Sequence, residues 1–119
     1  MQYFNRDGKF NFVDENNVFV GYDSDQDCCE TASWFVTDAP MSVEWLGETE
    51  VEIDWPKWRF DPSFFEKHEC VYDSGDVVIF RLVSGRQEKY LHLFNSHNGY
   101  YGHGFEMKIG GETVRDDIL

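Results

Sequence analysis

The clearest restriction on the fold comes from the last third of the chain, which follows the pattern of strands separated by turns. Residues 76–83 and 87–96 are rich in β-branched and aromatic side chains, and Ser-Gly-Arg at 84–86 predicts a turn between them. Asn98-Gly99 is a strong hairpin signal, because both residues tolerate the positive φ angles of a two-residue turn. Residues 100–109 then predict a returning strand, so this region is predicted to form a C-terminal three-stranded antiparallel meander.

A two-residue turn at Asn98-Gly99 also determines which side chains share a face of that sheet. It places Phe94 opposite His103 and His92 opposite Phe105. One face is then predicted to carry Tyr90, His92, Phe94, Tyr101, His103, Phe105 and Met107, and the other Leu91, Leu93, Asn95, Gly102 and Gly104. The two glycines predict a shallow depression beside Leu93 and Asn95. Because both faces hold large apolar groups, we expect this sheet to be covered on both sides.

The first half of the chain predicts further strands. Residues 9–13 and 17–22 are predicted strands joined by a polar turn at 14–16. Residues 29–37 favour a strand over a helix, because Trp34 to Thr37 suit a pleated surface. Residues 49–55 alternate between acidic and apolar side chains, which predicts a strand with one acidic face.

Residues 61–69 are the best helix candidate in the chain. Asp61 can cap the first turn, Pro62 suits the first helical position, and Glu66 completes a plausible start signal. The chain is therefore predicted to be α+β, mainly an antiparallel β-sheet with one short helix. A length of 119 residues fits a single globular domain over 1–119.

Charge and composition restrict the function. Ten basic and 23 acidic residues give a net charge of −13, which argues against direct binding to nucleic acid or to an anionic membrane. Aromatic residues make up 18% of the chain, which argues against acidic disorder. No apolar run approaches the ~20 residues that cross a bilayer, and residues 1–11 do not resemble a signal peptide. Three cysteines, two of them adjacent, do not suit a disulfide framework, so a cytoplasmic protein is expected.

Residues 22–30 form the most unusual segment. Asp23, Asp25 and Asp27 have the opening spacing of a calcium-binding loop. The rest of the loop does not fit, because Cys28 stands where glycine is needed and Trp34 where a bidentate glutamate is needed. A weaker cation site with oxygen ligands stays open.

The adjacent Cys28 and Cys29 raise two chemical alternatives. A zinc site would take its other ligands from His92, His97 or His103, but adjacent residues of a strand point to opposite faces and the usual C-x-x-C spacing is absent. A thiol nucleophile paired with His97 or His103 is disfavoured, because Asp25, Asp27 and Glu30 repel a thiolate. We therefore expect no catalytic residue and no cofactor, with zinc or another divalent cation as the weaker alternative.

The segment 95–105 combines rings, glycines and polar groups. A tight hairpin whose Tyr100 and Tyr101 pack across the sheet explains it without a function. The alternative is a recognition tip, because tyrosine offers a large contact area at a low cost in side-chain entropy.

Two segments, Asp25-Gln26-Asp27-Cys28-Cys29-Glu30 and Asn98-Gly99-Tyr100-Tyr101, resemble those of a family of small, acidic, uncharacterised proteins of bacteria and their phages. In that family an Asp-Gln-Asp-Cys-Cys-Glu segment precedes a strand, and an Asn-Gly-Tyr-Tyr hairpin comes late in the chain. Members tend to carry histidine just before the first segment, where this chain has Ser24. The resemblance implies no activity, but it implies that the two segments meet in space.

The sequence leads to two hypotheses of function. The first is a non-enzymatic acidic protein-interaction module, a monomer or homodimer, linked to a phage or mobile element, which occupies the basic nucleic-acid-binding groove of another protein. The second is a small metal-binding or thiol-dependent enzyme that uses the Cys28/Cys29 and His97/His103 segments. The residues predicted to bind are Asp25, Asp27, Cys28, Cys29, Glu30, His97, Asn98, Tyr100, Tyr101 and His103.

Overall fold

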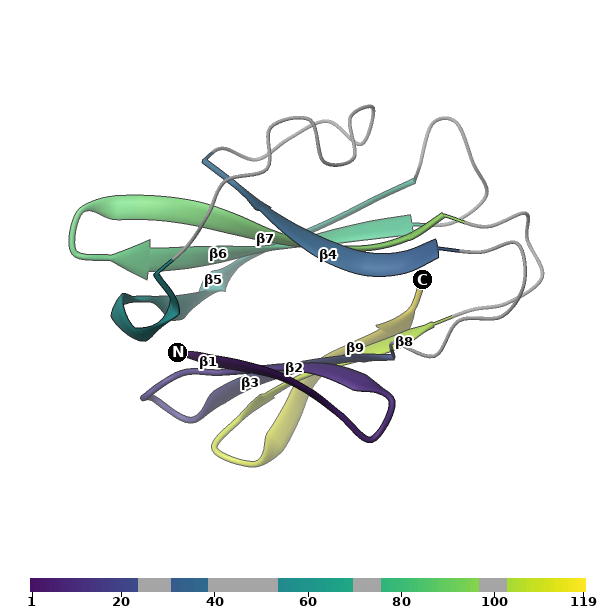
Figure 1. Cartoon of the computed structure of the whole chain (residues 1–119), viewed down its shortest axis with the longest axis horizontal. Coiled ribbons are helices and arrows are strands. Elements are labelled where there is room, and N and C mark those ends of the chain that lie inside the picture. The colour runs from purple at the N-terminus through teal and green to yellow at the C-terminus, as the bar shows by residue number, and fades with distance from the viewer. Residues whose placement is uncertain (24–30, 39–53, 70–75, 97–102) are drawn as a thin grey trace.

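The computed structural model describes residues 1–23, 31–38, 54–69, 76–96 and 103–119. They form nine β-strands in two sheets that lie face to face as a β-sandwich (Figure 1). The five-stranded sheet contains β1 (Gln2–Arg6), β2 (Lys9–Val13), β3 (Val18–Asp23), β8 (Gly104–Ile109) and β9 (Glu112–Ile118), in that spatial order. The four-stranded sheet contains β4 (Thr31–Thr37), β7 (Gln87–Ser96), β6 (Asp76–Ser84) and β5 (Arg59–Glu69), in that spatial order. Every neighbouring pair of strands is antiparallel.

The core lies between the two sheets and is built from alternate residues of each strand. Phe12, Val20 and Tyr22 supply it from the five-stranded sheet, and Leu82 and Leu91 from the four-stranded sheet, all fully buried. Burying an apolar side chain of this size stabilises the fold by roughly 1.5–3 kcal/mol. The intervening residues face outward on both sheets, because successive side chains of a strand point to opposite faces.

The predicted helix at residues 61–69 is wrong, and the α+β class with it. The whole segment belongs to β5, and the described parts of the chain contain no α-helix, only a 3₁₀ turn, η1 (Trp55–Lys57). Asp61 does accept hydrogen bonds locally, but from the backbone N–H and the hydroxyl of Ser63, at 3.1 and 2.6 Å. This short-range bond of an aspartate favours a turn as readily as a helix cap.

That turn is a bulge in β5. The register with β6 passes from Asp61 directly to Phe65, so Pro62, Ser63 and Phe64 have no partners on β6. A proline is tolerated there because a bulge does not need its missing N–H. Phe64 and Phe65 then point to opposite faces of the sheet, one toward Tyr90 outside and the other toward Phe105 in the core.

The predicted meander is correct only in its first hairpin. β6 and β7 pair through a turn at 85–86, as expected, but β7 lies between β4 and β6, whereas β8 lies between β3 and β9. The register that opposes His92 to Phe105 and Phe94 to His103 is therefore wrong. β7 uses both of its edges within its own sheet, so it has no edge left for β8. The turn at 98–99 lies outside the described residues.

The other strand predictions have mixed outcomes. The predicted strands 9–13, 17–22 and 29–37 are confirmed as β2, β3 and β4, the last over its described residues. Trp55 belongs to the 3₁₀ turn rather than to the end of a strand, and residues 49–53 lie outside the described part. β1 and β9 were not predicted. None of the described segments forms a helix of the length and apolar character that crossing a bilayer requires.

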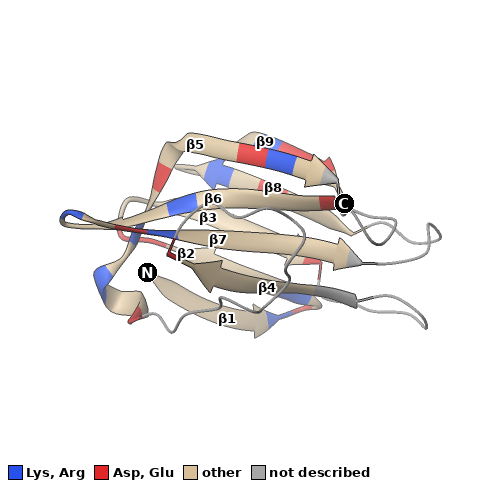
Figure 2. Cartoon of the chain, turned by 90° about the horizontal axis from the view of Figure 1, so that it is seen from above, with Lys and Arg blue, Asp and Glu red and all other residues tan. Residues whose placement is uncertain are grey.

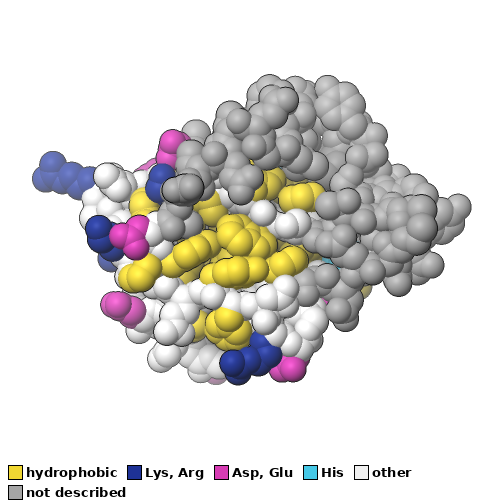
Figure 3. Space-filling view, in the orientation of Figure 1, with side chains coloured by type: hydrophobic (Ala, Val, Ile, Leu, Met, Phe, Trp, Pro, Cys, Tyr) yellow, Lys and Arg dark blue, Asp and Glu magenta, His cyan; other side chains and the backbone are white. Residues whose placement is uncertain are grey.

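The two long sides of the sandwich differ. Between β5 and β9, Lys67 forms an ion pair with Asp117 at 2.8 Å, and the guanidinium of Arg115 lies 4.6 Å from the ring centre of Phe65. Between β1 and β4, by contrast, half-buried aromatic rings reach the surface, and Figure 3 shows hydrophobic side chains gathered there. These rings are Tyr3, Phe10, Trp34 and Trp55, packed against the core.

Candidate functional site

Both segments that carry the family resemblance are attached to the same end of the sandwich. β3 ends at Asp23 and β4 begins at Thr31, so residues 24–30 join the two sheets there. β7 ends at Ser96, which pairs with Thr31, and the chain is described again from His103, which contacts Asp23. Residues 70–75 join β5 to β6 at this end too, because Glu69 pairs with Asp76. We call it the Asp23 end, on the right of Figure 1.

His103 is the one residue of the predicted binding set that lies in the described part of the chain. It is 2% exposed, its backbone exchanges hydrogen bonds of 3.0 and 2.8 Å with Leu119, and its Nδ1 lies 3.1 Å from the carbonyl oxygen of Asp23. The carboxylate of Asp23 is also near, at 3.7 Å from Nδ1. His103 thus fixes the start of β8 to the end of β3 and to the C-terminal residue.

Two further polar side chains fasten the four-stranded sheet to the five-stranded sheet at this end. The Tyr22 hydroxyl donates a hydrogen bond of 2.7 Å to the carbonyl oxygen of Phe94. The Asn95 Nδ2 donates one of 2.8 Å to the carbonyl oxygen of Leu119. Asn95 is completely buried, so this bond crosses the core between the sheets. The Asp23 end is a firmly connected frame from which the joining segments leave.

His92 and His103 are not brought together, contrary to the sequence prediction. His92 lies on the outer face of the four-stranded sheet, where its ring stacks on Phe35 with 4.4 Å between ring centres. Its Nδ1 lies 3.2 Å from the carbonyl oxygen of Tyr90, and its Nε2 has no hydrogen-bond partner among the described residues. Burial lowers the pKa of His92 to about 4, so the ring is neutral at pH 7. This arrangement is that of a core histidine.

The remaining predicted residues lie outside the described part of the chain. They are Asp25, Asp27, Cys28, Cys29, Glu30, His97, Asn98, Tyr100 and Tyr101. Within the described ranges, no group of three or more His, Cys, Asp and Glu side chains has the arrangement of a metal site.

A groove of about 570 Å³ lies on the outer face of the five-stranded sheet, beside the Asp23 end. Its described lining includes four acidic residues and one basic residue, Lys9. The predicted depression of Gly102 and Gly104 beside Leu93 and Asn95 is wrong in its neighbours, because Gly104 lines this groove on the other sheet, and Gly102 lies outside the described residues. The described lining residues are Lys9, Gly21, Asp23, Gly104, Phe105, Glu106, Asp116, Asp117 and Ile118.

Sequence reasoning missed the β9 side of this groove, because β9 itself was not predicted. Asp116 and Asp117 are adjacent, and their side chains point to opposite faces of the sheet. Asp116 pairs with Glu106 on the outer face, whereas Asp117 reaches Lys67 of β5. The Gly110-Gly111 turn before β9 is the signal that could have found the strand, because two glycines readily adopt the positive φ angles of 60° and 88° observed there.

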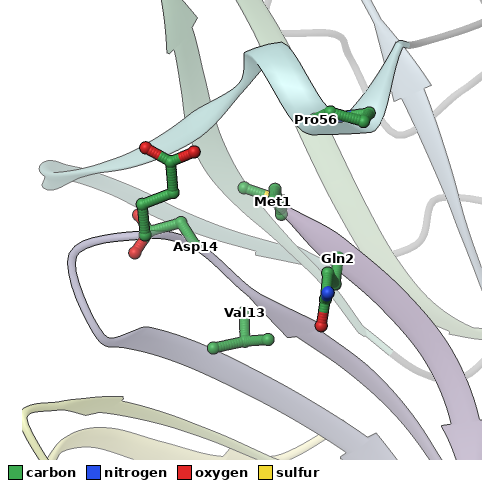
Figure 4. A pocket seen from close by; sticks show the side chains of 6 residues that line it. Met1, Gln2, Val13, Asp14 and Pro56 are labelled. Carbon is green, nitrogen blue, oxygen red and sulfur yellow. The ribbon is translucent and has the colours of Figure 1, made fainter.

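A second cavity, of about 450 Å³, lies at the opposite end beside Met1, Gln2, Val13 and Pro56 (Figure 4). Asp14 lines it, but both of its carboxylate oxygens accept hydrogen bonds from the backbone. Its Oδ1 accepts hydrogen bonds from the backbone of Asn16 and Val18 at 2.9 and 3.0 Å, and its Oδ2 accepts one from Phe60 at 2.9 Å. Asp14 thereby ties the β2–β3 turn to β5, which makes its role structural.

Comparison of the chain with protein-family models, with curated proteins and with solved structures gives no significant match. The function is therefore argued from the geometry and the charge of the chain itself.

Proposed function

We propose that this protein is a non-enzymatic interaction module that binds a basic protein through the segments leaving the Asp23 end, and that it competes there with nucleic acid. The observation that carries the proposal is an uneven distribution of charge. All ten Lys and Arg residues belong to the described framework of the sandwich, which also holds 15 acidic residues. Of the remaining eight acidic residues, four belong to the segments 24–30 and 70–75 at the Asp23 end and four to residues 39–53 between β4 and η1, and none of these segments contains Lys or Arg.

The framework charges neutralise one another to a large extent. Lys9 and Lys108 both lie near Glu106, Arg81 lies 3.1 Å from Asp61, and Lys89 lies 2.9 Å from Asp38. Figure 2 shows this mixture of signs along the strands. The segments 24–30 and 70–75 carry four carboxylates without such compensation from their own residues, so they add negative charge to the Asp23 end of the frame.

Such a field suits a partner with a groove that normally holds phosphates. Carboxylates on a fixed frame attract the lysines and arginines of that groove, and the association rate rises with the field. The sandwich supplies the frame, because joining segments at one end of two packed sheets are a common way to present binding residues. Asp25, Asp27, Glu30 and the tyrosines at 100–101 are the residues we propose to contact the partner.

The alternative of a metal- or thiol-dependent enzyme receives less support. It takes its ligand or base from His97, which lies outside the described residues, or from His103, whose ring is buried with its Nδ1 within hydrogen-bond distance of the Asp23 carbonyl oxygen. We therefore argue only the interaction module.

The test is a competition between nucleic acid and this protein for one partner. The tagged protein is used to capture basic proteins from a bacterial extract, and each captured protein is titrated with a short labelled DNA duplex with and without the module. We expect the module to displace the duplex, with an affinity that falls steeply between 50 and about 200 mM salt. A partner that holds DNA and module together would contradict the proposal.

A charge-matched pair of variants assigns the surface. The triple variant Asp25→Asn, Asp27→Asn, Glu30→Gln should weaken binding to that partner by at least about tenfold. The control neutralises three exposed framework carboxylates instead, Glu15→Gln, Asp54→Asn and Glu112→Gln, and should change the affinity by less than about threefold. Equal losses in both variants would mean that total charge, not the Asp23 end, determines binding.

A further inference from the structure

The groove on the five-stranded sheet is open at its floor. Gly104 lies in β8 with ordinary extended backbone, and a Cβ built there would have the carbonyl oxygen of Asp117 as its nearest described neighbour, at 3.9 Å. Gly21, on β3, lies under the ring of Phe19, at 2.9 Å from the corresponding Cβ position. The backbone of another chain could therefore lie closer to the sheet over Gly104 than over a residue with a side chain.

The rim of the groove is acidic and is only partly neutralised. The carboxylates of Asp23, Glu106 and Asp116 lie on the outer face, and Lys9 is the one basic residue among the described lining residues. Glu106 lies 3.6 Å from Lys9 and 3.8 Å from Lys108, and the Asp117 side chain is paired with Lys67 of β5, which lowers the pKa of Asp117. Asp116 is exposed and makes no ion pair within the described residues. The groove thus presents a negative surface that continues from the Asp23 end.

An apolar contact lies beside these carboxylates. The Ile118 side chain is 65% exposed at the end of β9, directly across from Gly104 in the register of the sheet. The methylene stems of lysine and arginine pack on apolar surface of this kind while their charged groups reach nearby carboxylates. A basic side chain therefore fits both parts of the groove.

We propose that the groove over Gly104 binds an extended segment of the partner protein that carries lysine or arginine, with its cation against Asp116 and its stem on Ile118. This proposal rests on the proposed function, because it names a second contact surface for the same basic partner. Three observations support it: the excess of carboxylates in the groove, the bare strand at Gly104, and the continuity of the groove with the Asp23 end.

Octalysine with a fluorescent label is the probe, and its binding to the full chain is followed by anisotropy at low salt. The critical variant is Asp116→Lys, and its matched control is Glu112→Lys, which makes the same charge change on the same exposed strand outside the groove. We expect Asp116→Lys to weaken octalysine binding by about tenfold and Glu112→Lys by less than about threefold.

Gly104→Leu tests the shape of the groove without changing its charge. The space around the Cβ position of Gly104 predicts that this variant folds, and its side chain should block the bare strand and weaken binding at least about fivefold. If this variant does not fold, the pair at 116 and 112 still decides the question.

Three outcomes would overturn the proposal. Octalysine would not bind, or the variants at 116 and 112 would lose equal affinity, or the chain would self-associate in a way that Gly104→Leu abolishes, which would make a second copy the occupant. These outcomes are separate from failure of the proposed function. If the module displaces DNA from its partner while Asp116→Lys and Gly104→Leu bind octalysine normally, the function stands and the groove is excluded.

Discussion

The outer faces of the two sheets differ more than any other two regions of the molecule. On the four-stranded sheet, Val77, Ile79 and Phe35 face away from the core and are nevertheless 0–3% exposed. On the five-stranded sheet, the outer face carries the acidic groove, and Phe4 and Ile118 are 37% and 65% exposed. Around Val77, Ile79 and Phe35 the first sheet is buried on both faces, whereas the second contributes only one face to the core.

This difference can be read in the sequences of the strands. β6 contains the uninterrupted apolar run Val77-Val78-Ile79-Phe80, in which every residue is buried. β2 alternates, with Phe10 and Phe12 facing the core and Lys9 and Asn11 facing outward. A strand covered on both faces needs no polar position, whereas a strand with one face in water alternates with a period of two. Apolar runs therefore mark the strands in which substitutions cost most.

The same substitution on the two outer faces provides the strongest test of this difference. Ile79→Ala leaves a cavity in a fully buried site, so we expect it to lower the free energy of unfolding by about 3 kcal/mol. Ile118→Ala removes an exposed side chain and should lower it by less than about 0.5 kcal/mol. Urea unfolding followed by tryptophan fluorescence measures both. Similar losses would mean that the outer face of the four-stranded sheet is open to water in solution.

The buried imidazole on that same face should make stability depend on pH. The pKa of His92 is about 4 in the folded protein, below its ordinary value near 6.5, because burial disfavours the charged ring. The unfolded chain therefore binds the proton more readily, so stability is highest above pH 6.5 and falls as the pH drops toward 4. A shift of this size corresponds to a loss of at most about 3 kcal/mol.

His92→Phe is the variant that isolates this effect. Phenylalanine can keep the stack on Phe35 and removes the Nε2, which has no partner within the described ranges, so we expect a variant at least as stable at pH 7 with a flatter profile between pH 6.5 and 4. The pKa values of Asp61 and Asp117 are lowered by hydrogen bonds from Ser63 and Lys67, so their contributions are lost only below this range. An unchanged slope in the variant would exclude His92 as its source.

The sequence predicted strands well where hydrophobic periodicity was the only signal needed. The ends of β6 and β7 were predicted to within one residue, and both ends of β2 were predicted correctly. Strong alternation or an apolar run identifies a strand without information from the rest of the chain. β1 and β9 were missed although the chain marks both with two-residue turns. Asp7-Gly8 and Gly110-Gly111 all have positive φ, as Asn98-Gly99 was expected to have, and each pair joins two antiparallel strands.

The assignment of strands to sheets could not be obtained in this way. No sequence pattern within residues 97–103 indicates whether β8 pairs with β7 or crosses to the other sheet. That pairing depends on which strand edges β3 and β4 leave free. The acidic groove could not be predicted for the same reason, because its lining residues come from β2, β3, β8 and β9. The glycines predicted a depression, but beside Leu93 and Asn95 of the other sheet, because a glycine in a strand leaves a gap on whichever sheet the strand joins.

The smallest expected effect concerns the hydrogen bond that ties the two sheets together at the Asp23 end. Tyr22→Phe removes the bond from the hydroxyl to the Phe94 carbonyl oxygen while it keeps the buried ring, so we expect a loss of about 1 kcal/mol in urea unfolding. Tyr3→Phe is the matched control, because its half-buried ring packs on Phe12 and Trp34 without a hydroxyl bond within the described residues. If Tyr22→Phe also weakens partner binding without further loss of stability, this bond serves to hold the joining segments in position for the partner.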